Sequence, residues 1–270
     1  MSNKPIVITI ASNKGGVGKT ATASSFTYLL GRKNKVLLID TDPQGNCAGK
    51  FGIEEEEGIG KLGEYINNRT QDAVAKEPLD NYLVHYDKNI AVLYGGKSVK
   101  TKVYDIIYSH DPQAAMYMFR DLVDEIANDG TFDYVIIDTS AAFGNEIYAI
   151  LNATDWVLSP TLAETDSVAG FNTLLKFVNS ARRSNPNLKI AGLFFNQVSD
   201  RSKAQKAMEP FSREAWKDKV FNTRIPYNPA AIYSAIIEAD PVTKKYPKSK
   251  SSLGFKKLLK ELLDKINAEE

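Results

Sequence analysis

Cysteine is nearly absent from this sequence, and neither sign of charge dominates it. Cys47 is the only cysteine among 270 residues, so no intrachain disulfide can form and no thiolate cluster can hold a metal. The 34 lysine and arginine residues nearly balance the 33 aspartate and glutamate residues, so bulk charge does not make the chain a polycation that coats nucleic acid. We therefore expect a cytoplasmic protein in a reducing compartment, in which any nucleic-acid binding comes from a local patch.

Long apolar runs are also missing. No segment approaches the roughly 20 apolar residues that a membrane span requires, and the first residues lack the apolar core and cleavage site of a secretory signal. Internal repeats and Pro/Ser-rich linkers are absent as well, so we expect residues 1–270 to form a single domain. These absences argue against a secreted protein and against one integral to a membrane.

Short runs rich in valine and isoleucine recur along the chain and are bounded by turn or polar residues. They span Ile6 to Ile10, Val36 to Ile39, Tyr134 to Ile137, Trp156 to Leu158, and Ile190 to Phe195. Such runs are typical of strands buried on both faces, and stretches with helical spacing lie between several of them. The alternation predicts an α/β fold with a mostly parallel twisted sheet and helices on both faces. The region from Gly49 to about His110 shows no clear period.

A glycine-rich segment stands directly after the first predicted strand and directly before a predicted helix, which is the context that a phosphate-binding loop (P-loop) requires. It consists of Asn13, Lys14, Gly15, Gly16, Val17, Gly18, Lys19 and Thr20, and we add the following Ala21 to the candidate nucleotide-binding residues. Glycines let the backbone curl until successive N–H groups point at phosphate oxygens, and the helix N-terminus adds positive potential. Lys19 would contact the β and γ phosphates, and the Thr20 hydroxyl would bind Mg²⁺.

Carboxylates follow two other predicted strands. Asp40 and Asp42 come after the run that ends at Ile39, and Asp138 directly follows the run that ends at Ile137. The carboxyl ends of parallel strands face the crevice in which such sheets bind ligands. In P-loop proteins an apolar strand that ends in a carboxylate supplies a Mg²⁺ ligand, often through water, so Asp138 is a candidate metal residue.

The sequence from Lys14 to Thr20 resembles the deviant P-loop of the ParA/MinD family of ATPases, in which the strict glycine pattern fails at the position of Asn13. The segment from Asp40 to Asn46 looks like the second signature of the ParA branch. This resemblance implies ATP and Mg²⁺ as cofactors, hydrolysis of ATP to ADP and phosphate, and a homodimer that forms with ATP.

The resemblance also assigns roles to individual residues. Lys14 would reach across a nucleotide-sandwich dimer to the phosphates of the other chain, and Lys14 and Lys19 would stabilise the charge that develops during hydrolysis. Asp42 would orient or activate the attacking water, and Asp40 would support the Mg²⁺ environment. Lys14, Lys19 and Asp42 are therefore the candidate catalytic residues, and Thr20, Asp40 and Asp138 are the candidate metal residues.

Similarity to the family covers nearly the whole chain and is weakest between Gly49 and His110. The stretch from Asn222 to Asn228 resembles a late switch segment near the adenine, which makes Pro226 a candidate nucleotide contact. Asn196 follows the run that ends at Phe195 and is either an adenine contact or a turn residue.

Members of this superfamily share the ATPase core and differ in what the dimer grips. A reductase like the nitrogenase iron protein needs two cysteines per chain, and a bacterial tyrosine kinase needs a C-terminal tyrosine cluster, and this sequence has neither. A MinD-like ATPase would bind membrane through an amphipathic C-terminal helix, and residues 253–266 are amphipathic. Because such a stripe also packs against a domain's own core, we favour packing and keep the MinD-like function as the alternative.

A ParA partition ATPase is the branch that the residues favour. In that family the ATP-bound dimer binds DNA without sequence preference and releases it after hydrolysis. Seven lysines and no acidic residue lie between Pro241 and Lys260, which predicts a basic C-terminal surface for DNA phosphates. The P-loop begins at Asn13, so we expect no N-terminal helix-turn-helix domain. A ParB-type centromere-binding protein would stimulate hydrolysis, and the protein would associate with the nucleoid.

Overall fold

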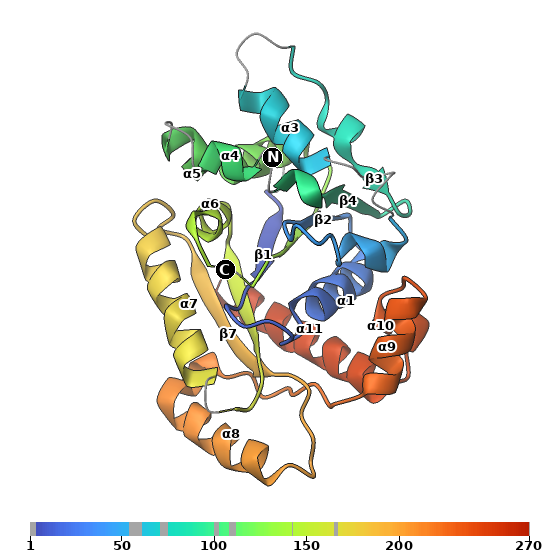
Figure 1. The fold of residues 1–270 in the computed structure, drawn as a ribbon, viewed down its shortest axis with the longest axis vertical. Coiled ribbons are helices and arrows are strands. Elements are labelled where there is room, and N and C mark those ends of the chain that lie inside the picture. The colour runs from blue at the N-terminus through green and yellow to red at the C-terminus, as the bar shows by residue number, and fades with distance from the viewer. Residues whose placement is uncertain are drawn as a thin grey trace.

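The computed structural model describes residues 4–53, 61–70, 75–99, 103–107, 112–141, 143–164 and 167–269. Within them, seven strands form one sheet in the order β3-β4-β2-β5-β1-β6-β7. The strands are β1 (Ile6–Ile10), β2 (Val36–Asp40), β3 (Val84–His85), β4 (Ile90–Tyr94), β5 (Tyr134–Asp138), β6 (Trp156–Thr161) and β7 (Lys189–Phe195). Neighbouring strands are parallel except β3, which pairs antiparallel with β4 at one edge. The mostly parallel sheet that the sequence predicts is confirmed (Figure 1).

Helices cover both faces of this sheet (Figure 1). The α-helices are α1 (Lys19–Gly31), α3 (Lys61–Thr70), α4 (Tyr104–Ile107), α5 (Pro112–Asp129), α6 (Asn145–Asn152), α7 (Ser167–Ala181), α8 (Lys203–Trp216), α9 (Pro229–Ile237), α10 (Val242–Lys245) and α11 (Lys250–Glu269). The described residues also form three short 3-10 helices, η1 (Ala48–Phe51), η2 (Leu79–Tyr82) and η4 (Lys217–Lys219). One hydrophobic core cluster lies between the sheet and helices α1, α9, α10 and α11. Two other clusters lie between the sheet and helices α3 through α8.

The strands are apolar along their whole length because both of their faces are covered. In β1, Ile8 faces the cluster of α1 and α11, whereas its neighbour Val7 faces the cluster of α3 and α5. The same alternation separates Leu38 from Leu37 in β2. Successive strand residues point to opposite faces, so a strand between two helical layers needs apolar side chains at every position.

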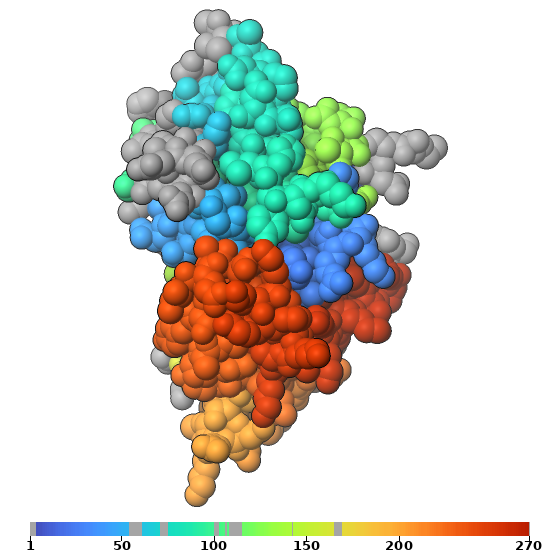
Figure 2. Space-filling view, turned by 90° about the vertical axis from the view of Figure 1, so that its right-hand side faces the viewer, coloured from blue at the N-terminus to red at the C-terminus, as the bar shows by residue number. Residues whose placement is uncertain are grey.

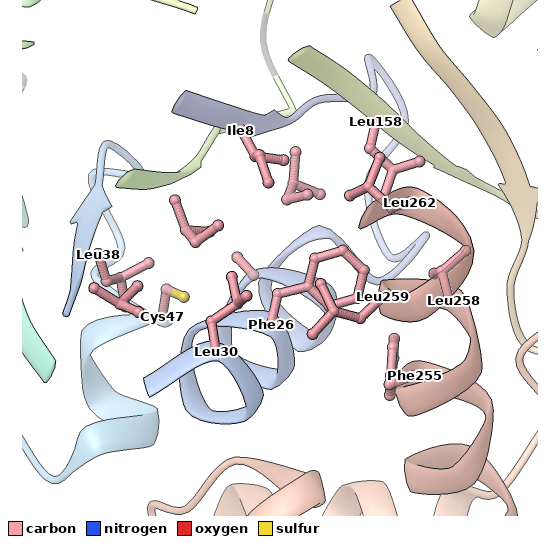
Figure 3. Close-up of a cluster of buried hydrophobic side chains, with 14 of the residues drawn as sticks. Ile8, Phe26, Leu30, Leu38, Cys47, Leu158, Phe255, Leu258, Leu259 and Leu262 are labelled. Carbon is pink, nitrogen blue, oxygen red and sulfur yellow. The ribbon is translucent and has the colours of Figure 1, made fainter. Parts of the chain in front are cut away.

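The C-terminal helix α11 belongs to the core. Phe255, Leu258 and Leu262 have no exposed surface and pack beside Phe26 of α1 (Figure 3). Each such side chain contributes about 1.5–3 kcal/mol by leaving water. The apolar stripe of the tail is thus covered by the protein's own core. No helix in the described part of the chain is long and apolar enough to cross a bilayer.

The sheet brings the predicted strand-end carboxylates together. Asp40 and Asp138 are register partners at the carboxyl ends of β2 and β5, and Ile10 at the end of β1 pairs with Asp138 on the other side. The P-loop leaves β1 at this same edge. Strand β4 lies in the region without a clear sequence period and adds a buried strand there, whereas His110 lies outside the described residues.

Candidate active site

The loop between β1 and α1 turns on glycines in the left-handed region. Gly16 has a φ of 72° and Gly18 a φ of 97°. A Cβ on Gly18 would lie 2.0 Å from Nδ2 of Asn196, so a side chain at this position would displace Asn196 and strain the backbone. Because α1 begins at Lys19, directly after Gly18, the positive end of the helix lies at the loop.

A cavity of about 620 Å³ opens at this loop and extends toward α9 and α11. The sequence-predicted residues that line it are Gly15, Gly16, Gly18, Lys19, Thr20, Ala21, Asp42, Asn196 and Pro226. Asn13, Lys14 and Val17 instead line a second cavity of about 310 Å³ between the loop, β6 and α7. The larger cavity has the size of a small-molecule site.

The end of the larger cavity away from the loop is largely apolar, although Asn228, Asp240 and Ser251 also line the cavity. Ile225 and Pro226 lie at the carboxyl end of β7, where the Ile225 N–H donates to the Phe195 carbonyl oxygen. They line this end of the cavity together with Ile232 of α9 and Phe255 of α11. Pro226 is held by a parallel bridge to Val198. A polar, amide-rich end opposite an apolar end suits a ligand that carries phosphates on one side and a flat base on the other.

Asp138 lies fully buried at the end of β5, next to the loop. The Thr20 hydroxyl donates to its Oδ2 at 2.8 Å, whereas its Oδ1 has no hydrogen-bond partner among the described residues. Burial and the neighbouring Asp40 carboxylate raise the pKa of Asp138 well above its usual value, although Thr20 and Lys19 oppose that rise. A buried carboxylate oxygen without a partner, beside a hydroxyl, offers the hard oxygen ligands that Mg²⁺ prefers.

The described residues contain no group of three or more His, Cys, Asp or Glu side chains placed to hold a metal ion. Mg²⁺ does not need such a group, because it binds through one or two protein oxygens and completes its shell with phosphates and water. Thr20 and Asp138 therefore fit a Mg²⁺ ion that arrives together with a phosphate ligand.

Asp40 is fully buried but has no free oxygen. The N–H of Asp42 donates to its Oδ1 at 3.1 Å, and the N–H groups of Cys47 and Ala48 each donate to its Oδ2 at 2.9 Å. Burial raises the pKa of Asp40 to about 6, against the effect of these hydrogen bonds. Asp40 thus shapes the loop that carries Asp42, and Asp42 itself lines the larger cavity.

The two loop lysines point in different directions. Lys19 is 7% exposed, and its Nζ donates to the Lys14 carbonyl oxygen at 3.2 Å. Burial lowers the pKa of Lys19, while the Asp138 and Asp42 carboxylates raise it. The Nζ of Lys14 instead lies 2.6 Å from Oε2 of Glu164, which follows β6. Lys14 is therefore directed away from the cavity that Lys19 lines.

Several residues that line the larger cavity are missed by the sequence analysis, among them Gln197 and Lys50. Gln197 lines the larger cavity, and its Nε2 donates to the Gly16 carbonyl oxygen at 2.7 Å. Lys50 of η1 lines the same cavity, and burial lowers its pKa. A glutamine after a strand and a lysine in a stretch without a period carry no local signal, so only the tertiary structure places them in the site.

Comparison with known proteins finds relatives along most of the chain. A protein-family model described as an AAA domain matches residues 6–190. The chromosome partitioning protein ParA of Caulobacter vibrioides is 28% identical over an alignment that covers 98% of this chain and 97% of that protein. The chromosome-partitioning ATPase Soj of Thermus thermophilus is 27% identical, with 96% of each chain covered.

Solved structures share the fold over nearly the whole chain. A cobyrinic acid a,c-diamide synthase from Mycobacterium smegmatis, with bound ATP analogue and magnesium, superposes with a TM-score of 0.78 at 22% identity and covers 98% of this chain and 97% of its own. The septum site-determining protein MinD of Pyrococcus horikoshii, complexed with Mg-ADP, gives a TM-score of 0.71 at 20% identity, with 96% of each chain covered. At these identities the likeness shows the fold.

Proposed function

Because the chain belongs to the ParA/MinD family of P-loop ATPases, we propose that it is a ParA-type ATPase for the partition of plasmid or chromosomal DNA. ATP and Mg²⁺ are its cofactors. Binding of ATP closes two copies into a sandwich dimer that binds DNA without sequence preference, and hydrolysis releases the DNA. A ParB-type centromere-binding protein stimulates hydrolysis, and the protein acts on the nucleoid in the cytoplasm.

The main support for this proposal is that the side chains of the two loop lysines point in different directions. Lys19 faces the cavity of its own chain, whereas Lys14 is held at the surface beside Glu164. Ion pairs as exposed as this one contribute about 0–1 kcal/mol, so Lys14 can leave Glu164 at little cost. A cation displayed on this face is suited to the phosphates of a second copy rather than to its own.

The residues of the chain divide the chemistry among them. The P-loop amides and the Lys19 ammonium bind the β and γ phosphates, and the burial of Lys19 strengthens that attraction. Thr20 and Asp138 would hold a Mg²⁺ ion, which would offset the charge of the phosphates when bound. Asp42, on the loop fixed by Asp40, orients the attacking water, and Lys14 of each chain stabilises the charge that develops in the other site.

Four lysines of the C-terminal segment are the candidate DNA contacts. Within the described part of the chain, three of the seven have carboxylate partners, since Lys244, Lys245 and Lys260 pair with Asp240, Glu238 and Asp264. The four without such a partner there are Lys248, Lys250, Lys256 and Lys257. This C-terminal part of the chain, orange to red, forms a continuous surface beside α1 (Figure 2). A dimer that neutralises eight phosphates would give a slope of roughly −7 for log affinity against log salt.

Variants at Lys14 and Asp42 test the dimer and the hydrolytic step. With ATP and Mg²⁺, light scattering should find twice the 29.9 kDa mass for the parent protein. Lys14→Ala should stay monomeric with ATP, and Asp42→Ala should dimerise without turnover and accumulate as the ATP-bound form. If Lys14→Ala dimerised and hydrolysed ATP like the parent, the cross-dimer role would be wrong. Full turnover by Asp42→Ala would contradict its role toward water.

Paired charge variants test the DNA surface. Lys256→Gln combined with Lys257→Gln should weaken ATP-dependent DNA binding and reduce its salt slope, because both lysines lack carboxylate partners in the described structure. Lys245→Gln combined with Lys260→Gln removes the same formal charge from lysines that are already ion-paired, and should weaken binding less. Equal losses in the two double variants would argue that bulk charge, rather than this surface, binds the DNA.

The alternative is a MinD-like ATPase that binds membrane through its C-terminal helix and positions a protein partner. That function would require α11 to leave the core, because Phe255, Leu258 and Leu262 are fully buried. Release of these three side chains would cost roughly 5–9 kcal/mol of apolar burial. The packing of α11 therefore favours the partition function.

A further inference from the structure

The connection between β7 and α8 touches the P-loop backbone directly. Nδ2 of Asn196 donates to the Val17 carbonyl oxygen at 2.7 Å, and Nε2 of Gln197 donates to the Gly16 carbonyl oxygen at 2.7 Å. The backbone N–H of Gln197 in turn donates to Oδ1 of Asn196 at 2.9 Å, which ties the Asn196 side chain to the backbone of Gln197. Two successive peptide groups of the loop are thus held by hydrogen bonds from residues outside the loop.

These two hydrogen bonds fix more than the carbonyl groups. A trans peptide is planar, and its C=O and N–H point in opposite directions, and the described chain has no cis peptide bond. Holding the carbonyl oxygens of Gly16 and Val17 therefore also sets the direction of the N–H groups of Val17 and Gly18. Loop amides are the groups with which a P-loop binds phosphate.

Gln197 adopts a strained backbone to make this contact. Its φ is 54°, in the left-handed region that residues with a Cβ rarely occupy. Such strain persists where the surrounding structure over-determines it, and it is concentrated at functional sites. The support here is Gln205 in the first turn of α8: its Oε1 accepts the Ser199 N–H at 2.7 Å, and its Nε2 donates to the Gln197 carbonyl oxygen at 3.3 Å.

We propose that Gln197 is a positioning residue that sets the affinity of the P-loop for nucleotide phosphates, with Gln205 of α8 as its support. The inference rests on the proposed binding of ATP and goes beyond it, because Gln197 acts on the loop backbone and need not touch the phosphates. The proposal also implies that a shift of the first turn of α8 would change the affinity of the P-loop for phosphate.

Replacement of Gln197 by glycine separates positioning from folding. Glycine accepts a φ of 54° without strain, so Gln197→Gly should keep or raise the thermal midpoint while it removes the donor to Gly16. Loss of one such hydrogen bond should raise the Kd for a fluorescent ATP analogue with Mg²⁺, and the KM for ATP, roughly threefold to tenfold. The kcat should change less than twofold. If Gln197 served only stability, its replacement would lower the thermal midpoint and leave the Kd and the KM unchanged.

Lys217→Gly is the matched control. Lys217 has a φ of 46° at the end of α8, and its side chain is exposed, so the change relieves the same kind of strain away from the loop. It should leave the Kd unchanged. Gln205→Ala should raise the Kd in the same direction as Gln197→Gly, by a smaller factor.

The outcomes distinguish the two proposals. If the parent binds the analogue and Gln197→Gly binds it equally well, the positioning role is wrong and the proposed ATPase function stands. The positioning role is also wrong if Lys217→Gly weakens binding as much as Gln197→Gly. If the parent itself fails to bind the analogue with Mg²⁺, the proposed function fails and the positioning role fails with it.

Discussion

Replacement of Asp138 by asparagine should stabilise the ligand-free protein while it abolishes stabilisation by Mg²⁺ and ATP. Asp138 is fully buried, its Oδ1 has no partner among the described residues, and burial together with Asp40 raises its pKa. An asparagine of nearly the same shape removes the buried charge and can still accept the hydrogen bond of Thr20 through its carbonyl oxygen. The carboxylate is thus retained for binding rather than for folding.

The magnitude follows from the buried charge that asparagine removes. A buried ionised carboxylate costs several kcal/mol, and for Asp138 we use about 3 kcal/mol because Thr20 satisfies one of its oxygens. The new amide donors cost about 1–2 kcal/mol where they lack acceptors. A net gain of about 1–2 kcal/mol remains. In a protein of this size each kcal/mol shifts Tm by about 2–4 °C, so we expect a rise of about 2–8 °C.

Thermal unfolding at pH 7.5, with and without Mg²⁺ and ATP, is the assay. The parent should gain stability from the ligands, and Asp138→Asn should begin higher and gain almost nothing. Asp133→Asn is the control, because Asp133 is exposed and its contact with the Lys35 N–H can be kept by an amide oxygen. A lower ligand-free Tm for Asp138→Asn would refute the reasoning about the buried charge. A parent-like gain with ligands would refute the metal role.

Three further changes have defined outcomes. Gly18→Ala should abolish nucleotide binding in a fluorescence titration, because its Cβ would lie 2.0 Å from Nδ2 of Asn196 at a φ of 97°; near-normal affinity would show that the loop can move aside. Leu262→Ala should lower the free energy of unfolding in urea by about 2–5 kcal/mol, because the side chain is fully buried; an unchanged midpoint would mean that α11 is not part of the core. Burial is the largest single influence on the pKa of Glu125 and raises it, but the hydrogen bonds from Arg69 and Tyr65 and the positive charges of Arg69 and Lys76 together lower that pKa below 4.5. Glu125 therefore stabilises the folded state above the pKa it has in the unfolded chain, and this contribution is lost as pH falls through its pKa in the folded state. Glu125→Gln should lower the free energy of unfolding in urea more at pH 7 than at pH 3. An equal effect at both pH values would contradict this.

The sheet could be predicted because parallel strands between two helical layers are apolar throughout. That signal marked β1, β2, β5, β6 and β7, but not β4, whose run from Ile90 to Tyr94 is bounded by a stretch without a period. The edge strand β3 has two residues and carries no pattern of its own.

The residues of the candidate phosphate site could be grouped from the sequence because they follow one another or end neighbouring strands. The contacts that orient them could not be predicted from it. Lys14 meets Glu164, and Gln197 meets Gly16, across 150 and 181 positions of sequence. Asp40, expected near Mg²⁺, has both oxygens bound by loop amides, which no local pattern indicates.

The most direct test of the central proposal is binding of the parent protein to a long DNA of arbitrary sequence without nucleotide, with ADP and with ATP plus Mg²⁺, at two salt concentrations and beside anionic liposomes. We expect DNA binding only with ATP and Mg²⁺, a steep loss at the higher salt, and no nucleotide-dependent binding to liposomes. ATP-dependent binding to liposomes and not to DNA would contradict the partition function and favour the MinD-like alternative.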